Sequence, residues 1–314
     1  MREPKETPEG RPKGAGRGPA FWTPVAESTG PRERLAVSRA PGGTGPVVAL
    51  VHGLEGGWEG WRPLAEALPG YRVYALDLPW RAGNPYRWRA YGSPAAWLRR
   101  ALDLVPEPVD VLLGHSFGAN AVLELLAEQA EQAEQAGQAE RADGAEREDG
   151  ASVSPAPSAA VLLAPFYRPD TLPVGWPLHD AARAGFRRIV TEGIRAGLGE
   201  RAGTLDPGIL SAMADTALER IGPVGFLSLF LQFVSTTELA LAQVTVDTLV
   251  LAGRHDESLA GDRATALAAA MPAATVRQHP HYGHFCHVEQ TADVAAETAA
   301  FLAALRTATP SATP

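Results

Sequence analysis

Short apolar runs alternate with longer amphipathic stretches along most of this chain of 314 residues. The short runs predict buried strands at 46–51, 71–78, 109–113, 159–164, 245–252 and 275–279, with a first, edge strand at 34–40. The longer stretches carry apolar residues at helical spacing and predict helices at 61–68, 94–105, 262–271 and 291–305. This alternation predicts an α/β fold, with a mostly parallel, twisted sheet and helices on both of its faces.

Three segments depart from this alternation. Residues 1–30 are rich in proline, glycine and charge, which predicts a disordered N-terminal arm. Residues 128–158 form a low-complexity insertion that begins with a Glu-Gln-Ala repeat; we expect it to prolong the preceding helix for a few turns and to be solvated or disordered after Gly137. Residues 166–243 carry helical patterns at 207–221 and 224–241 and predict a helical lid, which leaves 31–165 and 244–308 as the core of the domain.

Composition excludes several classes of protein. The chain is 45% hydrophobic, enough for a large core, and its 28 basic against 36 acidic residues give a net charge of −8 without a basic stripe, so we expect no nucleic-acid partner. Its one cysteine, Cys286, cannot form an internal disulfide, which favours a reducing, cytoplasmic location. We see no signal peptide, and the longest apolar stretch, near 224–234, is too short to span a bilayer. The oligomeric state stays open.

The stretch 109–126 combines a strand, a sharp turn and a helix. An apolar run ends at Gly114, and an apolar pattern of helical length resumes at 121–126. Between them lies Gly-His-Ser-Phe-Gly, residues 114–118. A turn this sharp crowds the positions two before and two after its apex, where glycine relieves the crowding. The apex residue, Ser116, is then predicted to present its hydroxyl at the end of the sheet, beside the N-terminus of the helix.

Polar residues follow three further strands of the predicted sheet. They are His52 to Leu54, Arg254 to Glu257, and the histidine-rich run 279–287. The carboxyl ends of parallel strands meet at one edge, so these groups are expected near Ser116. A serine hydroxyl needs a base within hydrogen-bond reach, and the base needs an orienting carboxylate.

The order of serine, acid and histidine along the chain is that of the α/β-hydrolase triad, and the sequence resembles this family from about residue 46 to 305, apart from the repeat insertion. The resemblance implies that Ser116 is the nucleophile, Asp256 the acid and His284, in a Gly-His pair before the final helix, the base. Competitors remain for both partners: Glu257 and Asp170 for the acid, and His279, His281 and His287 for the base. A zinc site that includes Cys286 is an alternative, but the spacings match no standard site, so we expect no metal and no cofactor.

The same resemblance implies an oxyanion hole formed by two main-chain N–H groups. They are those of Phe117, just after the nucleophile, and Leu54, after the His-Gly pair. Glu55 and Trp58, on the same loop as Leu54, are predicted to face the substrate, with ordinary loop packing as the alternative. His115, beside the nucleophile, is a further candidate substrate-binding residue.

Three hypotheses for the function follow. The first is hydrolysis of a small ester or thioester through an acyl-enzyme on Ser116. The second keeps the same fold and triad but uses them for acyl transfer, cyclisation or base-catalysed elimination, as a lyase, in a natural-product biosynthetic pathway. The third is a non-catalytic ligand-binding module, since a fold alone does not determine function. The sequence does not identify the substrate.

Overall fold

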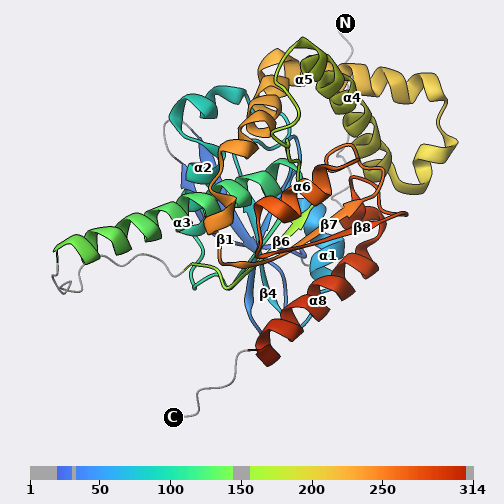
Figure 1. The fold of residues 1–314 in the computed structure, drawn as a ribbon. Helices are drawn as coiled ribbons and strands as arrows, with labels where there is room; N and C mark the ends of the chain where they lie inside the picture. Colours follow the sequence, from blue (N-terminus) through green and yellow to red (C-terminus); the bar gives the residue numbers. More distant parts are fainter. Residues whose placement is uncertain (1–19, 30–32, 144–155, 309–314) are drawn as a thin grey trace, which may run out of the picture.

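A single sheet organises the fold (Figure 1). The computed structural model describes residues 20–29, 33–143 and 156–308, and within these ranges eight strands pair in the order β1-β2-β4-β3-β5-β6-β7-β8. The strands are β1 Thr23–Thr29, β2 Arg34–Arg39, β3 Val47–Val51, β4 Arg72–Asp77, β5 Val111–His115, β6 Ala159–Leu163, β7 Asp247–Gly253 and β8 Ala274–His279. From β4 to β8 the pairings are parallel, while β2 pairs antiparallel with both β1 and β4. The predicted mostly parallel sheet is therefore confirmed.

Helices cover both faces of the sheet. The described helices are η1 Trp58–Trp61, α1 Arg62–Glu66, η2 Tyr86–Tyr91, α2 Pro94–Leu102, α3 Phe117–Asp143, α4 Trp176–Leu198, η3 Gly199–Thr204, α5 Pro207–Val234, η4 Ser235–Glu238, η5 Leu241–Gln243, α6 Arg263–Ala270, α7 Cys286–Glu289 and α8 Thr291–Ala308. One core cluster joins the sheet to α2, α3 and α6, and a second joins its other face to α1 and α8. Because β3, β5 and β6 are buried on both faces, their sequences are apolar apart from His115 at the end of β5.

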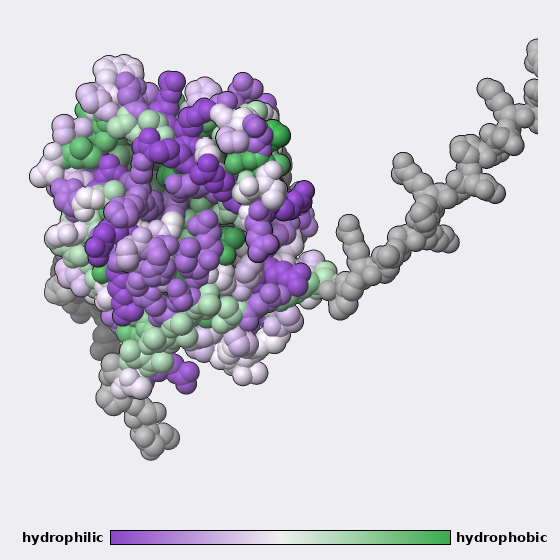
Figure 2. Space-filling model, turned by 90° about the vertical axis from the view of Figure 1, so that its right-hand side faces the viewer, coloured by the Kyte–Doolittle hydropathy of each residue, from purple (hydrophilic) through white to green (hydrophobic). Residues whose placement is uncertain are grey.

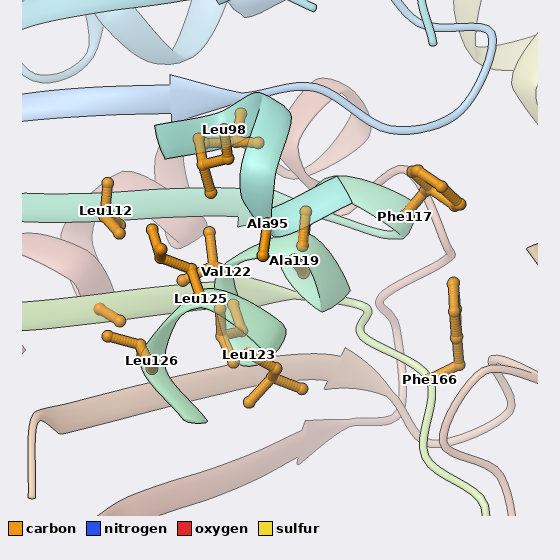
Figure 3. Packing of buried hydrophobic residues seen from close by; sticks show 14 of the residues in the cluster. Ala95, Leu98, Leu112, Phe117, Ala119, Val122, Leu123, Leu125, Leu126 and Phe166 are labelled. Carbon is orange, nitrogen blue, oxygen red and sulfur yellow. The ribbon is translucent and has the colours of Figure 1, made fainter. Parts of the chain in front are cut away.

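Helix α3 fixes the centre of this arrangement. Figure 3 shows Val122, Leu125 and Leu126 of its first turns among the side chains of Leu112 in β5 and Leu98 in α2. All of these side chains are at most 2% exposed. The start of α3, which follows Ser116 directly, is therefore held firmly against the sheet.

The N-terminal segment corrects one prediction. Thr23–Thr29 is not part of a disordered arm but forms β1, the edge strand, and β2 lies inside the sheet rather than at its edge. Six of the seven residues of β1 are exposed, so no alternation of apolar and polar residues marked the strand in the sequence. Main-chain pairing with β2 holds it instead. Residues 20–22 of the predicted arm are also described, with Trp22 buried, whereas 1–19 and residue 30 lie outside the described residues.

The low-complexity segment is helical further than predicted. Helix α3 passes through Gly137 without interruption, is helical as far as Asp143, the last described residue of this segment, and projects from the body of the protein (Figure 1). Its side chains at 131–135 are exposed, as expected of a solvated repeat. The remainder of the insertion, 144–155, lies outside the described residues.

The segment after β6 carries two long helices, and we call α4, η3 and α5 together the cap. Main-chain groups of Phe166, where this segment begins, bond the buried Asn120 side chain of α3 at 2.8 and 2.9 Å. The two predicted helical patterns are joined into one helix, α5, which kinks at Gly222 (φ 64°) before Pro223 and ends at Val234. By length and composition alone the stretch Pro207–Glu238 could cross a membrane, but a buried core helix passes the same test, and 44% of its most apolar window is buried.

The surface on the side of the cap and α8 is mostly hydrophilic. Figure 2 shows hydrophobic residues scattered over this face in small groups. Larger apolar side chains are exposed on the cap, among them Trp176, Val224 and Leu231.

Candidate active site

The turn between β5 and α3 holds Ser116 in a strained conformation. Its φ is 51°, in the left-handed region that residues other than glycine rarely adopt. A methyl group on Gly114 would lie 2.7 Å from the Cα of Ala119, and one on Gly118 would lie 2.4 Å from the carbonyl oxygens of Val51 and His52. Both glycines are therefore required by close packing of the main chain, as the sequence predicted.

A continuous chain of hydrogen bonds links Ser116, His284 and Asp256. The Oγ of Ser116 lies 2.9 Å from Nε2 of His284, whose Nδ1 lies 3.0 and 3.1 Å from the two carboxylate oxygens of Asp256. All three residues are at most 7% exposed. Since a carboxylate only accepts hydrogen bonds, Nδ1–H of His284 donates to Asp256, which leaves the Nε2 lone pair to accept from the serine hydroxyl.

The charges of His284 and Asp256 stabilise each other. Burial by itself lowers the pKa of His284, but the Asp256 carboxylate and, to a smaller extent, Glu192 of α4 outweigh it and raise the pKa above its usual value. Burial likewise opposes ionisation of Asp256, but the His284 ring and the main-chain N–H of Ser258, at 3.0 Å, hold the pKa of its carboxyl below the usual value. The acid is therefore ionised, and the ring is a stronger base than a free imidazole.

The two main-chain N–H groups predicted to form an oxyanion hole lie at the start of α3 and on the loop after β3. Phe117 is the first residue of α3, and N–H groups in the first turn of a helix have no partner within that helix. The loop after β3 carries Leu54, whose neighbour Glu55 bonds through its own N–H to the carbonyl of Trp80 at 2.9 Å. Within the described ranges, the Leu54 N–H has no protein acceptor, and Leu54 lines the same cavity as Ser116.

A cavity of about 650 Å³ lies above Ser116, between the loops at the carboxyl ends of the strands and the cap. Its apolar wall comes from the cap: Phe186, Ile189, Val190, Ile194, Ile221 and Leu229. Its polar wall includes Glu55, Ser116, Arg220, His284 and His287. A molecule with an apolar part and a carbonyl group could place the first against the cap and the second beside Ser116.

The structure brings two of the three predicted substrate-binding residues to this cavity. Glu55 lines it, but its carboxylate accepts hydrogen bonds from Tyr86 Oη at 2.7 Å and Arg220 Nη2 at 2.8 Å. His115 also lines it, and its ring is held by a 2.9 Å bond between Nε2 and the main-chain oxygen of His284. Trp58 does not line it: its ring packs against Trp22, at a centroid distance of 6.0 Å.

The competing acids lie elsewhere. Glu257, next to Asp256, forms an ion pair with Arg188 of α4. Asp170 is exposed on the loop after β6. Neither carboxylate bonds His284.

Two of the competing histidines are also held away from Ser116. The Nε2 atoms of His279 and His281 lie 2.9 Å from the Glu297 carboxylate and 3.4 Å from the Asp293 carboxylate. The third, His287, lines the cavity and packs against His115 with the rings tilted at 43° and a centroid distance of 4.1 Å. Burial lowers the pKa of His287 to about 3, so its ring is neutral.

Cys286 is fully buried, and burial raises the pKa of its thiol to about 12. Among the described residues no group of three or more His, Cys, Asp and Glu side chains is arranged to hold a metal ion.

Two residues that line the site were not predicted from the sequence. Trp61 rather than Trp58 lines the cavity, and its ring packs against that of His287 at a centroid distance of 4.7 Å. Nothing in the sequence distinguishes the two tryptophans, because the turn of η1 decides which ring points inward. Arg220 lies on α5, and only the position of the cap brings it to Glu55.

Comparison with known proteins identifies the family. The sequence profile of the alpha/beta hydrolase family matches residues 48–297, and the chain belongs to this family. No match was found among curated protein sequences.

Solved structures of similar fold include several hydrolases. A membrane phospholipase A described as a bacterial virulence factor has a TM-score of 0.61 at 18% identity, over 91% of this chain and 87% of that one. A thermophilic esterase from Thermogutta terrifontis has a TM-score of 0.54 at 19% identity, over 90% and 98%. The thioesterase domain from the curacin biosynthetic pathway has a TM-score of 0.55 at 15% identity, over 88% and 98%. At such identities these likenesses concern the fold.

Proposed function

We propose that the protein hydrolyses a small ester or thioester through an acyl-enzyme on Ser116. The observation that carries the proposal is the unbroken series of contacts from Ser116 Oγ through His284 to Asp256, at 2.9 to 3.1 Å, at the floor of a cavity. Solved esterase and thioesterase structures of the same fold are consistent with this choice of reaction.

In the first half of the reaction, Nε2 of His284 takes the proton of Ser116 as Oγ bonds to the substrate carbonyl carbon. The carbonyl oxygen becomes an oxyanion, and the N–H groups of Phe117 and Leu54 donate to it. The tetrahedral carbon then expels the alcohol or thiol, which takes its proton from Nε2 of His284. Asp256 holds the ring in the required tautomer and stabilises its positive charge.

In the second half, water attacks the acyl-enzyme. His284 takes one proton from the water as its oxygen bonds to the acyl carbon. The tetrahedral carbon then releases Oγ, which regains a proton from His284, and the carboxylic acid leaves. The water oxygen therefore ends in the product.

The test uses p-nitrophenyl esters and N-acetylcysteamine thioesters with acyl chains of increasing length, in water labelled with oxygen-18. We expect release of the alcohol or thiol, label in the acid, and loss of turnover in Ser116→Ala. Turnover without label in the product would favour transfer, cyclisation or elimination instead. Full turnover by Ser116→Ala, or failure of a fluorophosphonate to label Ser116 in the folded protein, would refute the proposal.

A further inference from the structure

Three residues of the proposed mechanism are each followed in the chain by a residue that contacts the cap. Glu55 follows Leu54, the second oxyanion donor, Glu257 follows Asp256, and Phe285 follows His284. These three neighbours lie on three separate loops, after β3, β7 and β8. Each meets a different residue of α4 or α5, so the contacts form a set rather than one local packing site.

The first contact is an ion pair between the oxyanion loop and α5. The Glu55 carboxylate lies 2.8 Å from Nη2 of Arg220, and its side chain is only 13% exposed. Glu55 itself is strained, with a φ of 55°. Its N–H bonds the carbonyl of Trp80, so both its main chain and its side chain are held. The Leu54 N–H belongs to the preceding peptide, whose Gly53 carbonyl accepts from the Gly56 N–H at 3.0 Å, so the main chain is held on both sides of Leu54.

The second contact joins α4 to the loop of the acid. Arg188 Nε donates to the Glu257 carboxylate, and Glu257 lies so near the helix that a methyl group on Gly185 would come within 2.5 Å of its Oε2. Arg263 Nη1 bonds the main-chain oxygen of the same residue at 2.6 Å. Glu257, the neighbour of Asp256, is thus held through its main chain by Arg263 and through its side chain by the cap.

The third contact joins α4 to the loop of the base. A methyl group on Gly193 would come within 2.7 Å of Cζ of Phe285 and 3.2 Å of its Cε2, so the absence of a side chain at Gly193 is what admits the ring. The ring in turn packs on His284 and His115, at centroid distances of 5.2 and 5.3 Å. A displaced Phe285 would therefore push directly on the imidazole that faces Ser116.

We propose that the cap is a positioning element for the proposed reaction, in which Arg220, Arg188 and Gly193 hold the oxyanion, acid and base loops in their reactive geometry. The inference rests on the proposed function, because it concerns the same three loops. In this proposal the cap does more than cover the cavity. A cover would affect mainly the binding of substrate, whereas these contacts affect the rate at which bound substrate reacts.

The glycines of α4 offer a matched test. Gly193→Ala places a methyl group against Phe285, while Gly197→Ala, four residues further along the same helix, meets no atom within 4 Å. Both changes raise helix propensity equally. We expect Gly193→Ala to lower kcat for p-nitrophenyl butyrate and the rate of fluorophosphonate labelling by about tenfold or more, with KM changed less than twofold. Gly197 also lines the cavity, but its methyl group would displace no residue, so Gly197→Ala should keep kcat and the labelling rate within about twofold of the wild type.

Rescue separates positioning from general damage to the fold. In Gly193→Ala with Phe285→Leu, the smaller side chain leaves room for the new methyl group, so we expect labelling to recover to the level of Phe285→Leu alone. Equal labelling of Gly193→Ala and Gly197→Ala would overturn the proposal for this contact. So would a defect in Gly193→Ala that Phe285→Leu does not relieve.

The salt dependence of fluorophosphonate labelling tests the ion pair between Arg220 and Glu55. Ionic strength of about 1 M shortens the screening length to about 3 Å and weakens an ion pair whose arginine side chain is 55% exposed. We expect the labelling rate of the wild type to fall in high salt, and that of Arg220→Met to be low and insensitive to salt. Arg195→Met, at an exposed arginine of α4, should behave as the wild type. Arg220→Met with a normal, salt-sensitive rate would overturn this part, whereas a wild type that no fluorophosphonate labels refutes the proposed function itself.

Discussion

Nε2 of His284 lies 2.9 Å from Oγ of Ser116, although 168 positions separate the two residues in the chain. The contact exists because β5 and β8 end at the same edge of the sheet, with β6 and β7 between them. It also joins a strained main chain, at Ser116, to a buried and charge-stabilised ring.

The pH dependence of turnover should reflect the raised pKa of His284. The ring accepts a proton only when neutral, so kcat/KM should rise with pH and reach half its plateau above about pH 6.5, the ordinary histidine value. Asp256→Asn removes the charge that raises this pKa. We therefore expect the midpoint to move to lower pH, together with a loss of rate that can reach about 10⁴-fold. Asp293→Asn, at an exposed carboxylate beside His281, is the control and should leave the midpoint unchanged. A midpoint that rises in Asp256→Asn would contradict this account.

Relief of strain at Ser116 should stabilise the protein. Both Ser116→Gly and Ser116→Ala remove the hydroxyl, but only glycine adopts a φ of 51° without cost. We expect Ser116→Gly to exceed Ser116→Ala in free energy of unfolding by about 1 kcal/mol. At Ser211, exposed within α5, the same comparison should reverse, because glycine is the poorer helix former. Urea unfolding of the four variants measures both differences, and equal stability of the two Ser116 variants would argue against strain.

Gly118 should tolerate no side chain. Its Cβ would lie 2.4 Å from two main-chain carbonyl oxygens, which cannot move without disturbing β3. We expect Gly118→Ala to lower the free energy of unfolding by about 3 kcal/mol or to prevent folding. Gly70→Ala, in a turn with no atom within 4 Å of the new methyl group, should change it by less than about 1 kcal/mol. Similar urea midpoints for both variants would contradict the packing argument.

Buried neutral imidazoles should make the fold sensitive to acid. Burial lowers the pKa of His52 to about 4 and that of His287 to about 3. As the pH falls from about 6.5 toward 4, the unfolded chain binds protons on these rings while the folded protein does not. Stability is therefore lost over this range, by roughly 3 kcal/mol per ring at pH of about 4.

A substitution at His287 isolates one of these contributions. Its Nδ1 is buried without a hydrogen-bond partner among the described residues, so His287→Phe loses no bond there. We expect His287→Phe to reduce the fall in Tm between about pH 7.5 and pH 5, and His281→Asn, at an exposed histidine, to leave it unchanged. An equally steep fall in His287→Phe would show that its burial does not govern the acid sensitivity.

Prediction from sequence succeeded where local pattern and local sterics carry the information. Continuous apolar runs marked β3, β5 and β6 because those strands are buried on both faces. It failed for β1, which has almost no buried side chain and depends on pairing with β2. It also underestimated α3, whose repeat continues as helix to Asp143.

The sequence by itself determined the α/β alternation, the family and the strained turn at Ser116, since each depends on residues close together in the chain. Only the tertiary structure decided which histidine reaches Ser116, which carboxylate reaches that histidine, that Trp61 rather than Trp58 lines the cavity, and that Arg220 meets Glu55. Such relationships depend on the relative positions of the strand ends and the cap. Packing of the whole sheet and its helices sets those positions, and no short stretch of sequence encodes them.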